Sequence, residues 1–97
     1  MPALTALEDP DGTPHADVFE RPRTVRLALD ADQRLPSHEH PDTNIVLYLV
    51  SGRLELTLGS DTYTLGAGDL IRFGGNQEIS PRAVEPSTAL LVFAPSG

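Results

Sequence analysis

The feature that most constrains the fold is a series of short apolar runs with a two-residue period, separated by glycine and proline turns. Val25, Leu27 and Leu29 recur at every second position, and residues 53–58 alternate between polar and apolar at every position. A period of two places successive side chains on opposite faces of a strand. No segment carries an apolar stripe with helical spacing. The chain is therefore expected to be all-β, a sandwich or a barrel.

The runs define the expected strands, which cover residues 16–20, 24–30, 45–50, 53–58, 62–65, 70–73 and 88–94. Ser51-Gly52 is predicted to close a hairpin, and further turns are predicted at 59–61 and 66–69. Residues 45–50 are apolar at every position. This predicts a strand covered by the core on one face and by another sheet or a second subunit on the other. We therefore expect a homodimer.

Composition limits the classes of function. The 97 residues suit one domain, with 1–16 expected as a flexible arm and 17–97 as the folded unit. The absence of cysteine excludes thiolate chemistry and favours the cytoplasm. A net charge of −7 and the lack of Trp speak against nucleic acid, and no apolar stretch suits a membrane. The cluster of Arg21, Arg23 and Arg26 is predicted to be a solvated strand edge.

Two groups of residues resemble the motifs of the cupin superfamily. The first motif of that family is a glycine, a His-x-His pair, a glutamate and a closing glycine. Here His38 and His40 supply the pair, and Gly52 falls at the closing glycine. Ile45 stands where the family has glutamate, and Asp32 stands in place of the first glycine.

The second group of residues resembles the later cupin motif. Gly68 stands at its opening glycine, whereas Gly74 and Asn76 occupy the positions of a proline and a glycine. Ile79 replaces the family's histidine, and Ala83 replaces its final asparagine. The resemblance spans about residues 24–95. It implies an all-β, cupin-type jelly-roll sandwich or barrel.

The resemblance also implies a divalent metal ion held by three histidines and one glutamate, and Zn, Mn, Fe and Ni are the candidates. Ile45 and Ile79 occupy two of these four positions and have no lone pair to donate. His38 and His40 remain as the candidate metal ligands. A third ligand would have to come from elsewhere, and the candidates are His15, Asn44, Gln77 and Glu78.

Three hypotheses for function follow. The first is a small-molecule-binding or sensing module without strong catalytic activity, whose pocket contains His38, His40, Ile45 and Ile79. Imidazoles titrate near neutrality, so this pocket could bind an anionic group at lower pH. The second is a metal-dependent enzyme, dioxygenase- or isomerase-like, that uses His38, His40 and an unidentified third ligand. The third is a structural dimer without a ligand.

Overall fold

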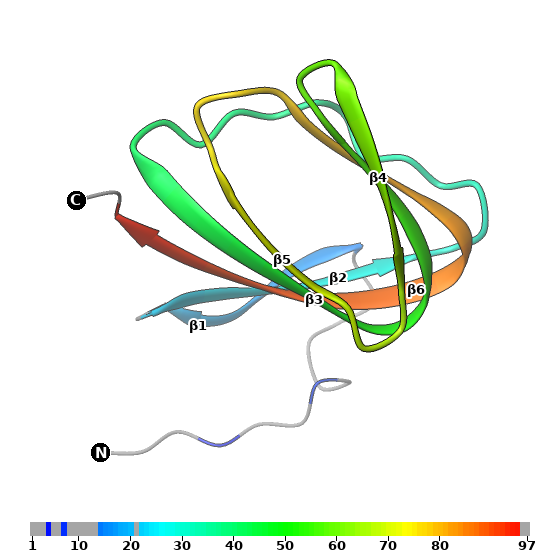
Figure 1. Ribbon diagram of the computed structural model, residues 1–97. Coiled ribbons are helices and arrows are strands. Elements are labelled where there is room, and N and C mark those ends of the chain that lie inside the picture. Colours follow the sequence, from blue (N-terminus) through cyan, green and yellow to red (C-terminus); the bar gives the residue numbers. More distant parts are fainter. Residues whose placement is uncertain (1–3, 5–6, 8–13, 21, 96–97) are drawn as a thin grey trace.

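Two long strands, β3 (Thr43–Leu58) and β6 (Ile79–Pro95), form the centre of the sheet (Figure 1). The computed structural model describes residues 4, 7, 14–20 and 22–95. Its other strands are β1 (His15–Glu20), β2 (Arg23–Leu29), β4 (Asp61–Gly66) and β5 (Leu70–Gly74). Every strand pairing is antiparallel, in the order β1-β2-β6-β3-β4, and β5 also pairs with β3. The all-β prediction is confirmed.

Both long strands take part in two halves of the structure. Residues 43–49 of β3 pair with β5 and with the end of β6, whereas residues 53–58 pair with β4 and with the start of β6. The register between β3 and β6 shifts three times between Leu49 and Leu54. Such bulges bend a strand. The two halves consequently curve toward each other into an open barrel (Figure 1).

The predicted hairpin at Ser51-Gly52 is wrong, because β3 continues through these residues as one strand. Gly52 has a φ of 91°, and a Cβ atom there would overlap the carbonyl oxygen of Pro86 and the side chain of Ser87. The backbone N–H of Arg53 donates a hydrogen bond of 3.0 Å to Ser87 Oγ. The glycine therefore serves a bulge packed against β6 rather than a turn. The expected strand 88–94 likewise extends back to Ile79.

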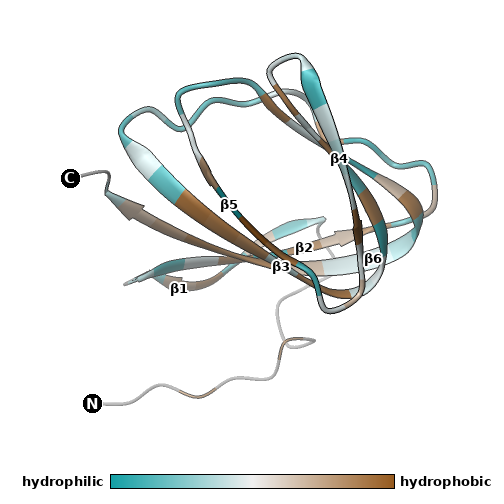
Figure 2. Cartoon of the chain, in the orientation of Figure 1, coloured by the Kyte–Doolittle hydropathy of each residue, from teal (hydrophilic) through white to brown (hydrophobic). Residues whose placement is uncertain are grey.

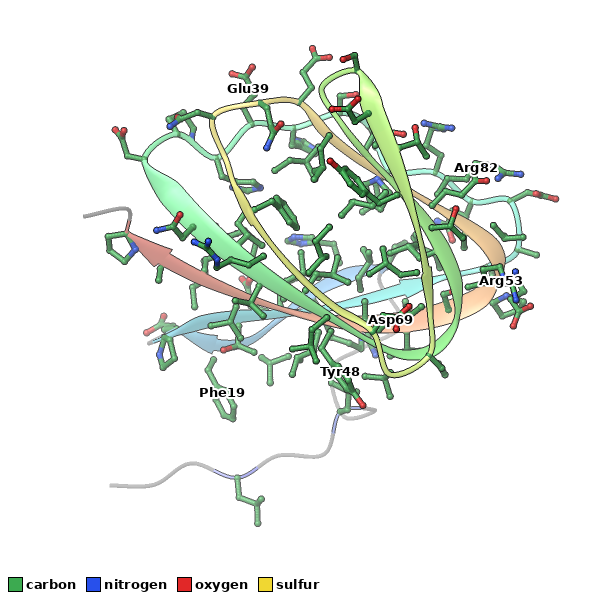
Figure 3. All side chains as sticks on the ribbon, viewed as in Figure 1. Phe19, Glu39, Tyr48, Arg53, Asp69 and Arg82 are labelled. Carbon is green, nitrogen blue, oxygen red and sulfur yellow. The ribbon has the colours of Figure 1, made fainter. Side chains whose placement is uncertain are left out.

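Side chains on the inner face form the core. The buried apolar cluster consists of Val25, Leu27, Leu29, Ile45, Leu47, Leu49, Leu54, Leu56, Leu58, Leu65, Phe73, Ile79, Ala83, Ala89 and Phe93. The alternate residues Val46, Tyr48 and Val50 are 37–38% exposed, and Tyr48 projects away from the barrel (Figure 3). The predicted burial of this strand on both faces is thus wrong within the single chain. Covering by a second subunit stays a prediction.

The polar segment between β2 and β3 is held against the start of β6. The N–H groups of Asp32 and Leu35 donate to the carbonyls of Ala83 and Pro81 at 2.8 and 3.1 Å. Asp32 has a φ of 66°, a left-handed conformation that glycine adopts most easily and that Asp tolerates. This accounts for a glycine at that position in the resembling motif. The segment lies at the hydrophilic upper end of the barrel (Figure 2).

The predictions for turns and termini have mixed outcomes. Turns occur at 59–60 and 67–68, as expected, and Gly59 and Gly68 have positive φ angles. Most of the predicted arm lies outside the described residues, but its last two residues, His15 and Ala16, already belong to β1. Within the described residues, no helix has the length and apolar character needed to cross a membrane.

Candidate functional site

The backbones of His38 and His40 are both held by the segment that joins β5 to β6. His38 and Ile79 exchange two backbone hydrogen bonds, of 3.1 and 2.8 Å. The N–H of His40 donates to the carbonyl oxygen of Gly75 at 2.9 Å. A Cβ atom at Gly75 would overlap the carbonyl oxygen of His40, so only glycine allows this approach without a backbone shift. Glu39, between the two histidines, points away from the barrel (Figure 3).

All three histidines of the chain line two adjoining hollows. His15, Leu35, His38 and His40 are common to both. The outer hollow has a volume of about 400 Å³ and is also lined by Arg23. The inner hollow has a volume of about 60 Å³, and its further lining residues are Leu27, Pro36, Ile79, Pro81, Leu91 and Phe93. The site therefore has a larger hollow beside Arg23 and a smaller hollow that is lined mostly by apolar side chains.

Phe93 connects the two parts of the site. Its ring centroid lies 4.9 Å from that of His40, with the planes tilted by 59°. The Arg23 guanidinium carbon lies 4.7 Å from the same centroid, which is a cation–π distance. The predicted solvated edge is therefore wrong for Arg26, which is 7% exposed, and incomplete for Arg23, which lines the entrance. Arg21 lies outside the described residues.

The site has a positive electrostatic character. Burial holds the pKa of His40 below its ordinary value of 6.5, and Coulombic repulsion from Arg23, His38 and His15 lowers it further. No aspartate or glutamate is among the residues that line the two hollows. The entrance thus places one permanent cation, Arg23, beside three imidazoles, and this arrangement favours an anionic group over a cationic one.

The described residues do not fit a resident metal ion. Within the part of the chain that the structure describes, no three His, Cys, Asp or Glu side chains are grouped closely enough to hold one. Of the predicted third ligands, His15 lines the hollows, whereas Asn44, Gln77 and Glu78 line neither. The Gln77 amide instead donates to the carbonyl oxygen of Gly74 at 2.9 Å. The two isoleucines at the family's ligand positions agree with this result.

The structure brings together most of the residues that the sequence singled out. His38, His40 and Ile79 line the inner hollow. Ile45 lines neither hollow and lies buried in the core, opposite Phe93 in the register of β3 and β6. Sequence reasoning missed Arg23 and Phe93. Each lies on a well-patterned strand, but no local signal indicates that these strands meet at the histidines.

The chain folds into an antiparallel barrel, and a histidine-lined hollow lies at the open end of that barrel. These two features together define its class of protein. The family model described as "Cupin domain" matches residues 25–94. The chain therefore belongs to the cupin-domain family, and the resemblance seen in its motifs is confirmed. A comparison with curated proteins found no match.

Solved structures show the same fold. One, an uncharacterised conserved protein with a double-stranded β-helix domain from Klebsiella pneumoniae, has a TM-score of 0.84 and 21% identity over 100% of this chain and 93% of that one. KdgF from a Halomonas species has a TM-score of 0.75 and 24% identity over 88% and 83% of the two chains. The conserved protein SPY1581 of unknown function from Streptococcus pyogenes has a TM-score of 0.69 and 27% identity over 75% of this chain. The match covers 63% of SPY1581, less than two thirds of its length.

Proposed function

We propose that this cupin is a small-molecule-binding or sensing module whose ligand occupies the hollow between the histidines and Phe93. The observation that carries the proposal is the convergence of Arg23 and all three histidines on one hollow with an apolar interior. Small-molecule sites typically combine an apolar wall with a few polar groups that orient the ligand. The fold alone does not select a function, so the proposal rests on the site.

The side chains at the site suit the binding of a small molecule without a metal better than they suit metal-dependent catalysis. A catalytic metal site usually keeps three protein ligands and one open position. The described residues provide no such group of three. The isoleucines add hydrocarbon instead, Ile79 at the wall of the inner hollow and Ile45 in the core behind it.

An NMR screen tests the proposal. Small organic fragments are titrated into the ¹⁵N-labelled full chain, and we expect some to cause saturable amide shifts at His38, His40 and Phe93. Leu91→Phe should abolish these shifts, because Leu91 lines the inner hollow. Val84→Phe, also on β6, is the matched control, because Val84 is exposed and is not among the lining residues. A screen in which no fragment shifts the lining residues would refute the proposal.

The alternative is a metal-dependent enzyme that uses His38, His40 and a third ligand such as His15, which lines the same hollow. The two hypotheses differ in metal content. If the protein is expressed in metal-supplemented medium, the binding-module proposal expects equally low metal in the wild type and in His38→Ala/His40→Ala. Stoichiometric metal that the double substitution removes would favour the enzyme.

We further propose that the protein is cytoplasmic and binds neither nucleic acid nor membranes. Its support is the composition, with a net charge of −7 and no cysteine. Cell fractionation with an antibody against the full chain would test the location.

A further inference from the structure

The residues at the entrance of the site indicate which chemical class of ligand the pocket would bind. Arg23 forms no ion pair within the described residues, where both ion pairs involve Arg82. Its guanidinium lies over Phe93 instead. Glu20 lies opposite Arg23 in the register of β1 and β2, and Asp42 shares a neighbouring hollow with it, but Arg23 is the one permanently charged residue among those that line the two histidine-lined hollows. A guanidinium presents its donors in a fork that matches a carboxylate.

Phe93 also limits where that charge can lie. The aromatic face is negative, so it attracts the guanidinium and holds it at the rim of the entrance. Phe93 and its neighbour His40 also line the inner hollow. Phe93 therefore fixes the position of the Arg23 guanidinium relative to the inner hollow.

The inner hollow sets the size of the uncharged part of a ligand. Its volume of about 60 Å³ corresponds to roughly two groups of the size of water, at about 30 Å³ each. Leu27, Leu91 and Phe93 supply hydrocarbon to its wall. A short apolar tail would fill this space, whereas a bare ion would leave it empty or wet.

We propose that the ligand is an organic carboxylate with a short, branched or linear apolar tail. The carboxylate lies at the entrance against Arg23 and the histidines, and the tail enters the inner hollow. This inference rests on the proposed function and names the chemical class of its ligand. The Arg23 guanidinium, which lines the outer hollow without an acidic lining residue, supports the same class.

The test compares three probes at pH 7 and constant ionic strength: isovalerate, its neutral isostere isovaleramide, and acetate. Amide shifts of the ¹⁵N-labelled full chain give the dissociation constants. Isovalerate should bind at least tenfold more tightly than isovaleramide, because a hydrogen bond to a charged group contributes a factor of about 10 or more. It should also bind at least tenfold more tightly than acetate, since each buried methylene contributes a factor of about four.

Two arginine variants locate the charge effect. Arg23→Gln should weaken isovalerate at least tenfold and leave isovaleramide unchanged. Arg72→Gln is the matched control, because Arg72 is an exposed arginine on β5 that lines neither hollow. Its affinity for isovalerate should equal that of the wild type. Dispersed amide spectra of both variants establish that they are folded.

The outcomes separate this inference from the proposed function. Equal binding of isovalerate and isovaleramide, or an unchanged affinity in Arg23→Gln, would overturn the carboxylate class and leave the pocket intact. An absence of saturable isovalerate shifts at the lining residues would also overturn the inference. The proposed function itself fails only when the wider fragment screen produces no shifts at these residues either.

Discussion

At the scale of single residues, the missing side chain of Gly75 affects the site as directly as the imidazoles do. The carbonyl oxygen of His40 occupies the place that a Cβ atom of residue 75 would take. The N–H of Gly75 also donates to the carbonyl oxygen of Thr43 at 2.8 Å, which ties the β5–β6 connection to the start of β3. The position of His40 therefore depends on a glycine that the sequence motifs do not single out.

We predict that Gly75→Ala lowers the free energy of unfolding by about 1–3 kcal/mol, because the added methyl forces the backbone of His40 to move. The same change should weaken isovalerate binding. Gly74→Ala is the matched control, since a Cβ atom there meets nothing within 4 Å. Urea denaturation gives the stability, and the NMR titration gives the affinity. Equal effects of the two substitutions would show that the close contact does not matter.

At the scale of elements, the bulge in β3 determines the curvature of the sheet. Ser87 Oγ accepts from the N–H of Arg53 and donates to a nearby carbonyl, either that of Arg53 at 3.0 Å or that of Glu85 at 2.7 Å. Gly52 fits between this side chain and the carbonyl of Pro86. The bend thus results from a contact between β3 and β6, and not from the local preference of Ser51-Gly52 for a turn.

A comparison of Gly52 with Gly68 separates two effects on stability: the close contact of Gly52 with β6 and the strain of a positive φ angle. Both have a φ above 90°, but only Gly52 is closely packed, because a Cβ atom at Gly68 meets nothing within 4 Å. Gly68→Ala should cost about 1–2 kcal/mol, the usual penalty of a left-handed conformation. Gly52→Ala should cost about 1–3 kcal/mol more. Urea unfolding measures both values, and equal losses would contradict the packing role of Gly52.

At the scale of the whole molecule, the outer face of the sheet carries several exposed apolar side chains, with Arg72 opposite Val46. Val46, Tyr48 and Val50 on β3 are 37–38% exposed, and Leu70 on β5 is 66% exposed. Tyr48 pairs with Leu70 on one side and with Leu90 on the other, so these side chains form one continuous patch. We propose that a second copy of the chain covers it, because the same patch on two copies can meet across a two-fold axis.

The expected result is a dimer of full chains by light scattering at micromolar concentration. Tyr48→Lys should produce a monomer, because it places a charge in the middle of the apolar patch. Tyr63→Lys is the matched control. Tyr63 is 45% exposed but lies opposite the core residue Leu56 in the register of β3 and β4, on the other face. A wild-type monomer, or a Tyr48→Lys variant that remains a dimer, would exclude this interface.

Local patterns were sufficient for most of the strands, since alternation is a property of neighbouring residues. They also identified His38, His40 and Ile79, because short motifs of the family retain their spacing. The hairpin at Ser51-Gly52 could not be judged in this way. A turn and a glycine bulge have the same composition, and only the pairing of β3 with β6 along its whole length distinguishes them.

The sequence by itself determined an all-β fold, the positions of most strands and two of the histidines of the candidate site. Only the tertiary structure placed His15 from β1, Arg23 from β2 and Phe93 from β6 around those histidines. It also placed Ile45 in the core rather than at the pocket wall. The physical reason is that strand content follows from a local period, whereas the site forms where segments distant in sequence are joined by strand pairing.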